Sequence, residues 1–255
     1  MMENVLTVKD LTVQINNIPL INNVSFSIDE GEAVLLSGEN GIGKSTLLKA
    51  LLGLESAGKR ISGSIFVRGI GDIITLEPEE LQLYRASVAY VPQRDDYSSL
   101  GNVRVRDIIS DSSMAFSGES MSDAEVNSLI DKWIPRKTDN SRVFDAKMKP
   151  AKFSGGEQRL LSVLSIISTR SRANLLIIDE PLNNLDFINA RNISNVINRA
   201  MKDNPRIGLL MISHCRIFPF ITREIKLTPE GIQNIAERYV CHSCFGSPDE
   251  NGFFK

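Results

Sequence analysis

The chain of 255 residues carries a formal net charge of −2 and 42% hydrophobic residues, the composition of a soluble globular protein with one large domain. Its 29 basic and 31 acidic residues exclude a broadly basic surface, so we expect no nucleic-acid partner. No apolar run approaches the ~20 residues of a membrane span, no secretory signal is visible, and three cysteines are too few for a disulfide framework. We therefore predict a cytoplasmic protein that reaches a membrane only through a partner.

The first thirty residues predict short antiparallel strands. Apolar and polar residues alternate in Val5–Val8, Leu11–Ile15 and Val24–Ile28, as they do in strands with one buried face. The pair Asn16-Asn17 marks a turn between the second and third pieces. The three pieces together indicate an antiparallel sheet.

Three continuous apolar runs are typical of strands that are buried on both faces. They are Ala33–Leu36, Leu175–Ile178 and Ile207–Ile212. Helical segments separate them, so we expect a parallel sheet with right-handed crossovers. The expected helices are 45–52, 154–168 and 188–201, and further strands are expected at 61–67, 87–91 and a closing hairpin at 224–232. The segment between 67 and 87 is acidic and predicts turns.

We interpret residues 98–153 as a mainly helical subdomain inside a single domain of residues 1–255. Ser122 and Glu125 have the spacing of a capping box, and the helix that they begin runs to about Trp133 before Pro135 stops it. The alternative is a disordered loop of the same length. The tail, 237–255, is polar and is expected to be loosely held.

A phosphate-binding loop is predicted at Gly38–Ser45, which matches G-x-x-x-x-G-K-[ST] between a buried strand and a helix. Its glycines let backbone N–H groups converge on phosphate oxygens, and the helix N-terminus adds positive charge. Lys44 is expected to reach the β- and γ-phosphates, Ser45 to bind Mg²⁺, and Thr46 to help position the phosphates. The other candidate phosphate contacts are Gly38, Asn40, Gly41 and Gly43. The alternative interpretation is a turn that is glycine-rich by chance.

Two carboxylates follow the second buried strand, at the edge where open α/β sheets bind ligands. Asp179 suits the role of holding Mg²⁺, and Glu180 is placed to polarise a water that attacks the γ-phosphate. A strand that simply ends in solvated carboxylates is the alternative, and the nearby phosphate loop favours the functional interpretation.

Further motifs occur in an order that resembles the ATP-binding cassette (ABC) ATPases over residues 4–235. Phe153–Gln158 resembles the L-S-G-G-Q signature, and Gln93, in Tyr90-Val91-Pro92-Gln93, looks like the Q-loop. Leu182–Asp186 looks like the D-loop, and His214 looks like the switch histidine. The resemblance implies an α/β P-loop NTPase fold (RecA-like), with a parallel-sheet core, an antiparallel β subdomain and a helical subdomain.

The resemblance also implies an ATPase that works as a homo- or heterodimer of nucleotide-binding domains, with ATP and Mg²⁺ between the two chains. The signature of one chain would contact the γ-phosphate held by the other. The residues that would do so are Ser154, Gly155 and Gly156. Gln93 would contact Mg²⁺ or the attacking water, His214 would bridge the γ-phosphate and Glu180, and Asp186 would carry contacts between the two sites. The expected Mg²⁺ ligands are Ser45, Gln93 and Asp179.

The sequence departs from the family pattern at several positions. Ile15 stands where an aromatic residue usually stacks on adenine, and an aliphatic contact loses ~0.5–1.5 kcal/mol of aromatic interaction. Glu157 replaces the signature glutamine, and Leu160 stands where many members carry arginine. Cys241 and Cys244 form a single C-x-x-C pair, which lacks the further ligands of a zinc site and favours a free-thiol tail.

The leading hypothesis is a subunit that hydrolyses ATP and powers transport through separate membrane-spanning subunits, bound peripherally at the inner face of the cell membrane. The alternative is a soluble ABC ATPase of a non-transport assembly system, such as iron–sulfur cluster assembly. A DNA-repair ABC ATPase is a third class, but no heptad array of a long coiled coil is present. An inert binding module would lack the catalytic carboxylate, whereas Glu180 is present.

Overall fold

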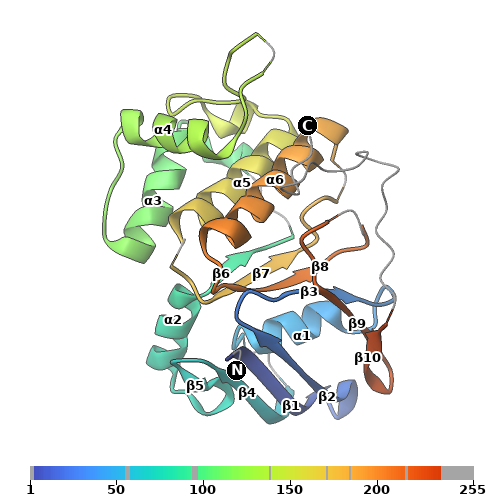
Figure 1. The fold of residues 1–255 in the computed structure, drawn as a ribbon. Helices are drawn as coiled ribbons and strands as arrows, with labels where there is room; N and C mark the ends of the chain where they lie inside the picture. Colours follow the sequence, from blue (N-terminus) through green and yellow to red (C-terminus); the bar gives the residue numbers. More distant parts are fainter. Residues whose placement is uncertain are drawn as a thin grey trace.

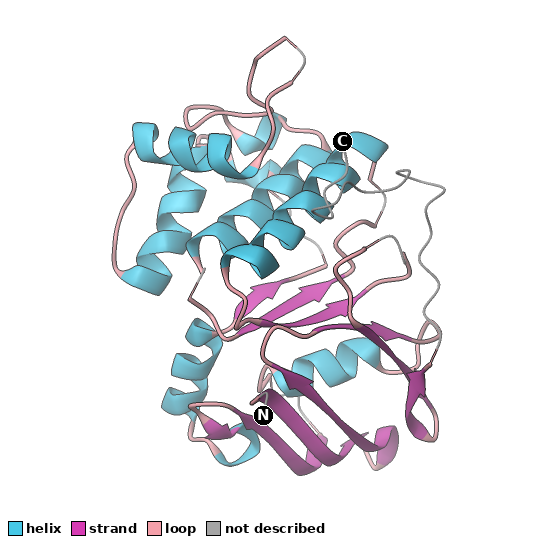
Figure 2. Ribbon diagram, viewed as in Figure 1, coloured by secondary structure: helices cyan, strands magenta, loops and turns pink. Residues whose placement is uncertain are grey.

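A computed structural model gives the fold as stacked layers of helices and sheets (Figure 1). The helices α3 to α6 form a layer over one face of a central sheet, α1 lies on its other face, and a second sheet lies beyond α1 (Figure 2). The structure describes residues 3–54, 58–93, 97–137, 139–170, 172–183, 185–215 and 218–236. Asn184 of the D-loop and the Cys241–Cys244 pair lie outside the described residues.

Within the described residues, the strands form two sheets, with the orders β2-β1-β4-β5 and β10-β9-β3-β8-β7-β6. The strands are β1 (Asn4–Ile15), β2 (Ile18–Asp29), β3 (Ala33–Ser37), β4 (Lys59–Val67), β5 (Gly71–Asp72), β6 (Ala89–Val91), β7 (Leu175–Asp179), β8 (Gly208–Ile212), β9 (Arg223–Thr228) and β10 (Gly231–Ile235). The α-helices are α1 (Lys44–Leu51), α2 (Pro78–Ser87), α3 (Val105–Ser117), α4 (Asp123–Trp133), α5 (Gly155–Thr169) and α6 (Phe187–Asp203). No helix in this part of the chain is both long and apolar enough to cross a membrane.

The central sheet is parallel except at β10, as the apolar runs predict. β3 pairs in parallel with β8 and β9, and β7 pairs in parallel with β6 and β8. Alternate residues of these strands enter two separate cores: Leu176 and Ile178 pack with α3 to α6, while Leu175 and Ile177 pack with α1 and the antiparallel sheet. Burial on both faces therefore explains why these strands are continuously apolar. Their carboxyl ends meet at one edge of the sheet.

The antiparallel sheet corrects one prediction of the sequence. The two short strands expected at 5–8 and 11–15 are one strand, β1, with an irregular register around Asp10. Asp10 has a φ of 49°, and its N–H donates to the Ser25 hydroxyl at 2.8 Å, which holds a bulge. The expected turn at Asn16-Asn17 is present, and both residues have positive φ, as a tight hairpin requires.

A second correction concerns the acidic segment before the Q-loop, where the sequence predicts turns and a strand from Ser87. This segment contains α2, and Ser87 ends the helix. Glu77 and Glu80 form a reciprocal capping box around Pro78 at the first helical position. Tyr84 is fully buried, and its hydroxyl donates to the Leu51 carbonyl at 2.6 Å. The acidic residue before Pro78 is therefore the N-cap of a helix and not part of a turn.

The region 98–153 contains α3 and α4, and Ser122 caps α4 through the expected capping box with Glu125. The apolar faces of both helices join the core that α5, α6 and the central sheet share. The assignment of residues 98–153 to a helical subdomain stays a prediction: within the described residues, α3 and α4 have no hydrophobic core of their own.

Candidate functional site

The loop between β3 and α1 presents a helix N-terminus without a side-chain cap. Gly43 is the N-cap residue, with a φ of 110°, and no side chain accepts from the first-turn N–H groups. A Cβ at Gly43 would lie 2.8 Å from the Leu20 carbonyl oxygen, so only glycine fits between this loop and β2. The open N–H groups and the helix dipole make this terminus a site for an anion.

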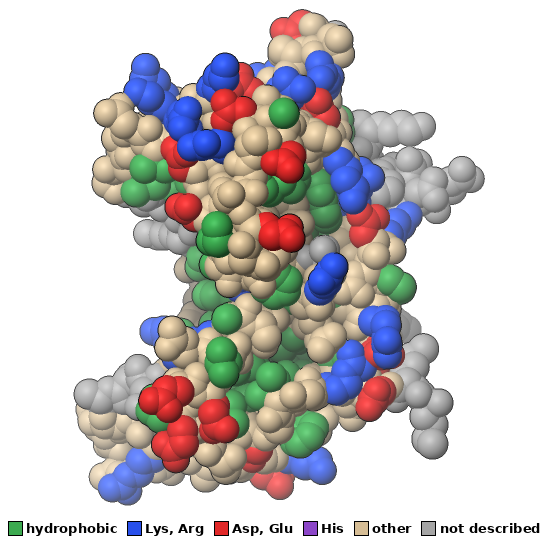
Figure 3. Space-filling model, turned by 90° about the vertical axis from the view of Figure 1, so that its left-hand side faces the viewer, with side chains coloured by type: hydrophobic (Ala, Val, Ile, Leu, Met, Phe, Trp, Pro, Cys, Tyr) green, Lys and Arg blue, Asp and Glu red, His purple; other side chains and the backbone are tan. Residues whose placement is uncertain are grey.

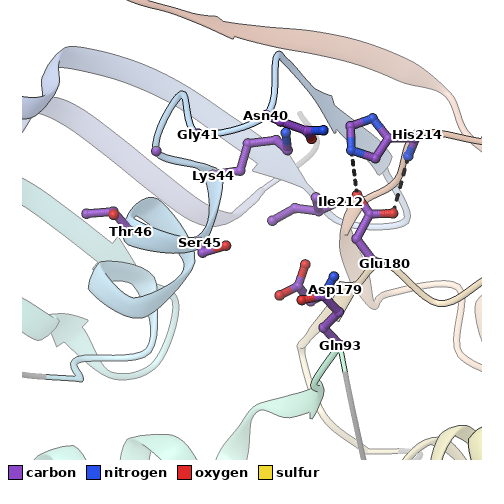
Figure 4. A pocket seen from close by; sticks show the side chains of 11 residues that line it. Asn40, Gly41, Lys44, Ser45, Thr46, Gln93, Asp179, Glu180, Ile212 and His214 are labelled. Carbon is purple, nitrogen blue, oxygen red and sulfur yellow. Dashed lines mark hydrogen bonds and ion pairs between the residues drawn. The ribbon is translucent and has the colours of Figure 1, made fainter. Parts of the chain in front are cut away.

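This terminus lines a cavity of about 250 Å³ in which most of the predicted site residues converge (Figure 4). Ser45 and Asp179 face each other across it, from α1 and from the end of β7 (Figure 4). The residues that line the cavity are Asn40, Gly41, Gly43, Lys44, Ser45, Thr46, Gln93, Asp179, Glu180, Ile212 and His214. Gly38 lines an adjacent cavity on the other side of the loop, together with His214 and Lys226.

Lys44 folds back over its own loop. Its ammonium donates to the Gly38 carbonyl at 2.8 Å and to the Glu39 carbonyl at 2.9 Å. These two carbonyls satisfy the ammonium beside the cavity. An anion at the α1 N-terminus has Lys44 within reach without any change in the fold.

Glu180 is held at the carboxyl edge of the sheet in a strained backbone conformation. Its φ is 45°, unusual for a residue with a side chain, and its N–H donates to the Ile212 carbonyl at 2.9 Å. Burial raises the pKa of the Glu180 carboxyl, the Asp179 carboxylate adds to the rise, and His214 opposes it. A carboxylate kept from full solvation is a stronger proton acceptor than an exposed one.

His214 contacts Glu180 twice. The imidazole Nε2 lies 3.4 Å from Glu180 Oε1, and the His214 backbone N–H donates to Oε2 at 3.4 Å (Figure 4). The His214 side chain is 57% exposed, whereas that of Glu180 is 11% exposed. The histidine can therefore reach a ligand in the cavity while it fixes the carboxylate.

The donors present fit a magnesium ion. Ser45, Gln93 and Asp179 all line the cavity and bring a hydroxyl, an amide and a carboxylate oxygen. Such hard oxygen donors, completed by water and phosphate, are the ligands that Mg²⁺ prefers. Burial raises the pKa of Asp179, and Arg159 and Lys44 oppose the rise. A cation in the cavity would favour the ionised carboxylate.

The predicted signature residues do not line this cavity. Ser154 is the N-cap of α5 and is exposed, and its hydroxyl accepts from the Glu157 N–H at 3.2 Å. Glu157 in turn accepts from the Ser154 N–H at 2.9 Å. Gly156 packs so closely on the Asn189 amide that a Cβ would collide with it. The α5 N-terminus thus faces solvent in one chain.

Asp186 and Ile15 also lie outside the cavity. Asp186 caps α6: its Oδ1 accepts from the Asn189 N–H at 2.9 Å and its Oδ2 accepts from the Asn189 amide at 2.6 Å. These hydrogen bonds, chiefly that from the Asn189 N–H, hold the pKa of Asp186 below its usual value. Ile15 ends β1 and pairs with Ile18.

Sequence reasoning missed two residues at this site. Ile212 lines the cavity from the end of β8. Arg159 lies 7% exposed behind the carboxylates and donates to the Asp179 carbonyl at 3.0 Å. The signal for Arg159 was an arginine directly before the apolar run of α5, because a buried guanidinium needs nearby acceptors. Ile212 carried no signal beyond the end of an apolar strand.

The chain is similar in sequence to known proteins. A family model described as "ABC transporter" matches residues 21–183. The oligopeptide transport ATP-binding protein OppD of Escherichia coli (strain K12) is 32% identical over 219 residues, which are 82% of this chain and 62% of OppD. The putative ATP-binding protein YdiF of Bacillus subtilis (strain 168) is 30% identical over 239 residues, 92% of this chain and 31% of YdiF. This chain therefore spans less than two thirds of the length of these relatives.

A solved structure described as the ATP binding subunit of an ABC transporter has the same fold. It superposes with a TM-score of 0.68 at 23% sequence identity, and the match covers 91% of this chain and 90% of the other. At this identity the likeness speaks for the fold alone.

Proposed function

The chain belongs to the ABC transporter family of ATP-binding proteins, and on that premise we propose that it binds and hydrolyses Mg·ATP to power transport through separate membrane subunits. The observation that carries the proposal is the convergence of an open helix N-terminus, a lysine, two carboxylates and a histidine on one cavity. A triphosphate is the anion that uses all of these groups together.

Binding would begin at the loop before α1. The β-phosphate would accept from the uncapped N–H groups, and Lys44 would exchange the Gly38 and Glu39 carbonyls for phosphate oxygens. Ser45, Gln93 and Asp179 would hold Mg²⁺, which when bound neutralises charge between the β- and γ-phosphates.

Hydrolysis would depend on Glu180 as the proton acceptor for an in-line water. Its partly desolvated carboxylate and its fixed orientation suit that role, because His214 contacts the carboxylate and the Ile212 carbonyl accepts from the Glu180 backbone N–H. The exposed imidazole of His214 would contact the γ-phosphate. The reaction transfers the γ-phosphoryl group to water, and Glu180 takes the proton.

A second chain would complete the site. The cavity is open, and the exposed N-terminus of α5 in the same chain lies outside it. A head-to-tail dimer would bring Ser154, Gly155 and Gly156 of one chain to the γ-phosphate held by the other. Asp186, which caps α6 beside Gly156, would then lie at the same interface.

Exposed apolar side chains on α2 and α3 support docking of membrane subunits. They gather at the waist of the face that carries α2 and α3 (Figure 3). Leu83 of α2 is 72% exposed and Met114 of α3 is 49% exposed, and these two helices contact each other. Such a patch marks an interaction site. We place the protein at the inner face of the cell membrane through this contact, and OppD is by name a transport protein.

The substitution Glu180→Gln tests the enzymatic part of the proposal. We expect the rate of ATP hydrolysis to fall by about 10²–10³-fold, because the proton acceptor is lost, while ATP binding persists and the ATP-bound dimer accumulates. Release of inorganic phosphate and size-exclusion chromatography with Mg·ATP are the measurements. Glu230→Gln, at an exposed turn, is the matched control. Unchanged turnover in Glu180→Gln would refute the role of Glu180.

Purification from detergent extracts of the native source tests the transport part. We expect integral membrane proteins to co-purify with the wild-type chain and to be lost with Leu83→Glu, because a charge in the exposed apolar patch opposes docking. Retention of soluble partners alone would favour an assembly ATPase instead.

A further inference from the structure

Two consecutive residues of α5 point back into the chain rather than outward with the signature. Gln158 and Arg159 follow the capping box of Ser154 and Glu157 directly. Both side chains hydrogen-bond to backbone groups, and each reaches at least one segment that lies far away in the sequence. Their partners include both flanks of Glu180 and both flanks of the segment that carries Gln93.

Arg159 holds the backbone on either side of Glu180. Its guanidinium donates from Nη2 to the Asp179 carbonyl at 3.0 Å and from Nε to the Pro181 carbonyl at 3.3 Å. The residue between these two carbonyls is the one with the strained φ of 45°. The planar guanidinium is hydrogen-bonded to the carbonyls of both neighbouring residues, so it opposes relaxation of that strain.

The same guanidinium reaches the Q-loop. Arg159 Nη1 donates to the Pro92 carbonyl, directly before Gln93. Gln158 contacts the far flank, since its Oε1 accepts from the Tyr97 N–H at 3.4 Å. The Gln158 amide nitrogen also donates to the Pro150 carbonyl at 3.2 Å and to the Phe153 carbonyl at 3.4 Å, just before the signature.

We propose that Arg159, with Gln158 beside it, is a positioning residue that joins the signature end of α5 to Glu180 and Gln93 of the same chain. The proposal rests on the function proposed above, and it adds a physical connection between the two nucleotide sites of a dimer. In a head-to-tail dimer, Glu180 and Gln93 serve the ATP of their own chain, while Ser154 serves the ATP of the partner. Arg159 and Gln158 therefore couple the signature of a chain to the nucleotide in that chain's own site.

The single tryptophan of the chain gives a readout that does not depend on hydrolysis. Trp133 ends α4 and lies between Lys132, 5.7 Å from its ring centre, and Arg199 of α6 at 5.8 Å. A shift of the α3–α4 region against α6 changes the contact between Trp133 and Arg199 and hence the emission. Because Tyr97 leads from the Q-loop into that region, nucleotide binding at Gln93 is expected to alter the fluorescence of Trp133.

The test compares Arg159→Lys and Gln158→Met with the wild-type chain. Lysine keeps the charge but lacks the planar fork whose separate nitrogens reach carbonyls on both sides of Glu180 and at Pro92, and methionine removes the amide at similar size. We expect kcat to fall by about tenfold or more in Arg159→Lys and by about threefold in Gln158→Met, with the Kd for ATP within about twofold of wild type. The Trp133 response to Mg·ATP should shrink in both variants.

The controls are Arg60→Lys and Gln82→Met, which make the same changes at exposed positions. Gln158→Glu sharpens the test, because it keeps the acceptor for Tyr97 and loses the donor to Pro150 and Phe153, so the Trp133 response should persist while kcat falls.

Two results would overturn the inference: wild-type kcat in Arg159→Lys, or a wild-type chain that binds Mg·ATP without any change in Trp133 emission. A wild-type chain that binds ATP but does not hydrolyse it would refute the proposed function alone, since the fluorescence comparison would still decide the coupling.

Discussion

Two helix N-termini of this protein, those of α1 and α5, have glycines at or beside the N-cap but are built in opposite ways. The α1 terminus has Gly43 as its N-cap and no side-chain acceptor, so its N–H groups stay open to the cavity. The α5 terminus has Ser154 as its N-cap and is closed by the carboxylate of Glu157. One terminus is ready for an external anion, and the other already holds an internal one.

In the proposed function, this difference would give the two helix termini different roles in nucleotide binding. At α1, a bound phosphate would meet N–H groups that no side chain satisfies, so binding would break no side-chain hydrogen bond of the helix terminus. At α5, a phosphate from a partner chain would have to displace Glu157, whose Oε2 accepts from both the Ser154 N–H and its hydroxyl, at 2.9 and 3.2 Å. We therefore expect tight binding at the first terminus and conditional binding at the second.

The largest effect is expected at the open terminus. Lys44→Ala should abolish ATP binding, with the Kd raised by about 100-fold or more, because the loop loses the cation that we propose to bind the β- and γ-phosphates. Binding of a fluorescent ATP analogue measures the change. Lys49→Ala, on the exposed face of the same helix, should bind normally. Retained binding in Lys44→Ala would remove the assignment of the phosphate loop.

Ser154→Ala tests the closed terminus against an equivalent one. Ser122 forms the same capping box with Glu125 at α4, away from the cavity. Either substitution to alanine should cost about 1 kcal/mol of stability, because each removes a helix cap. Only Ser154→Ala should also reduce ATP-driven dimerisation, by about tenfold, as sedimentation with Mg·ATP would measure. Equal dimerisation in both variants would contradict a role for Ser154 at the interface.

A smaller effect of opposite sign is expected from Glu157→Gln. Glutamine can still accept from the Ser154 N–H, but it removes the negative charge that competes with phosphate. ATP-driven dimerisation should strengthen by about threefold, measured by sedimentation across a range of ATP concentrations. Glu125→Gln is the control at the α4 capping box. Weaker dimerisation in Glu157→Gln would show that the carboxylate assists the signature rather than competing with phosphate.

The smallest effect is expected on the thermal stability of the chain without nucleotide. Burial raises the pKa of Glu180 above its unfolded value, so the folded state holds a proton more readily than the unfolded state. The ionised carboxylate therefore destabilises the fold fully above the folded pKa, and this penalty disappears as the pH falls through that pKa toward the unfolded value. Glu180→Gln should raise Tm by about 2 °C near pH 7–8.

Thermal unfolding followed by circular dichroism from pH 8 to pH 4.5 measures this gain, which should fade toward the acid end. A gain that stays constant with pH would mean that it does not arise from the charge. The same titration predicts that ATP hydrolysis falls on the acid side at a higher pH than an ordinary glutamate would give, because only ionised Glu180 accepts the proton.

The amino-acid sequence alone predicted most strands of the central sheet and most of the helices that pack on it. Continuous apolar runs predicted β3, β7 and β8, the capping box at Ser122 predicted the start of α4, and the apolar run after Ser154 predicted α5. These signals are local, since a strand buried on both faces and a capped helix start each carry their pattern within a few residues. The phosphate loop belongs to the same class.

Patterns that depend on distant partners were predicted less well. The strand β1 was split in two because Asp10 interrupts the alternation, and only the Ser25 hydroxyl across the sheet shows that the strand continues through a bulge. The helix α2 was missed because acidic and proline residues also mark turns, and what fixes the helix is the burial of Tyr84 against Leu51.

By itself, the sequence determined which chemical groups the protein carries and which local element holds each of them. Tertiary structure alone decided that Lys44, Asp179, Glu180 and His214 share one cavity while Ser154 lies outside it. It also decided that Arg159 turns inward to three carbonyls from two separate segments, one on both sides of Glu180 and one at Pro92. The physical reason is that helix starts and buried strands are fixed by neighbours in sequence, whereas buried charges are satisfied by whichever backbone groups the packing of the sheet brings to them.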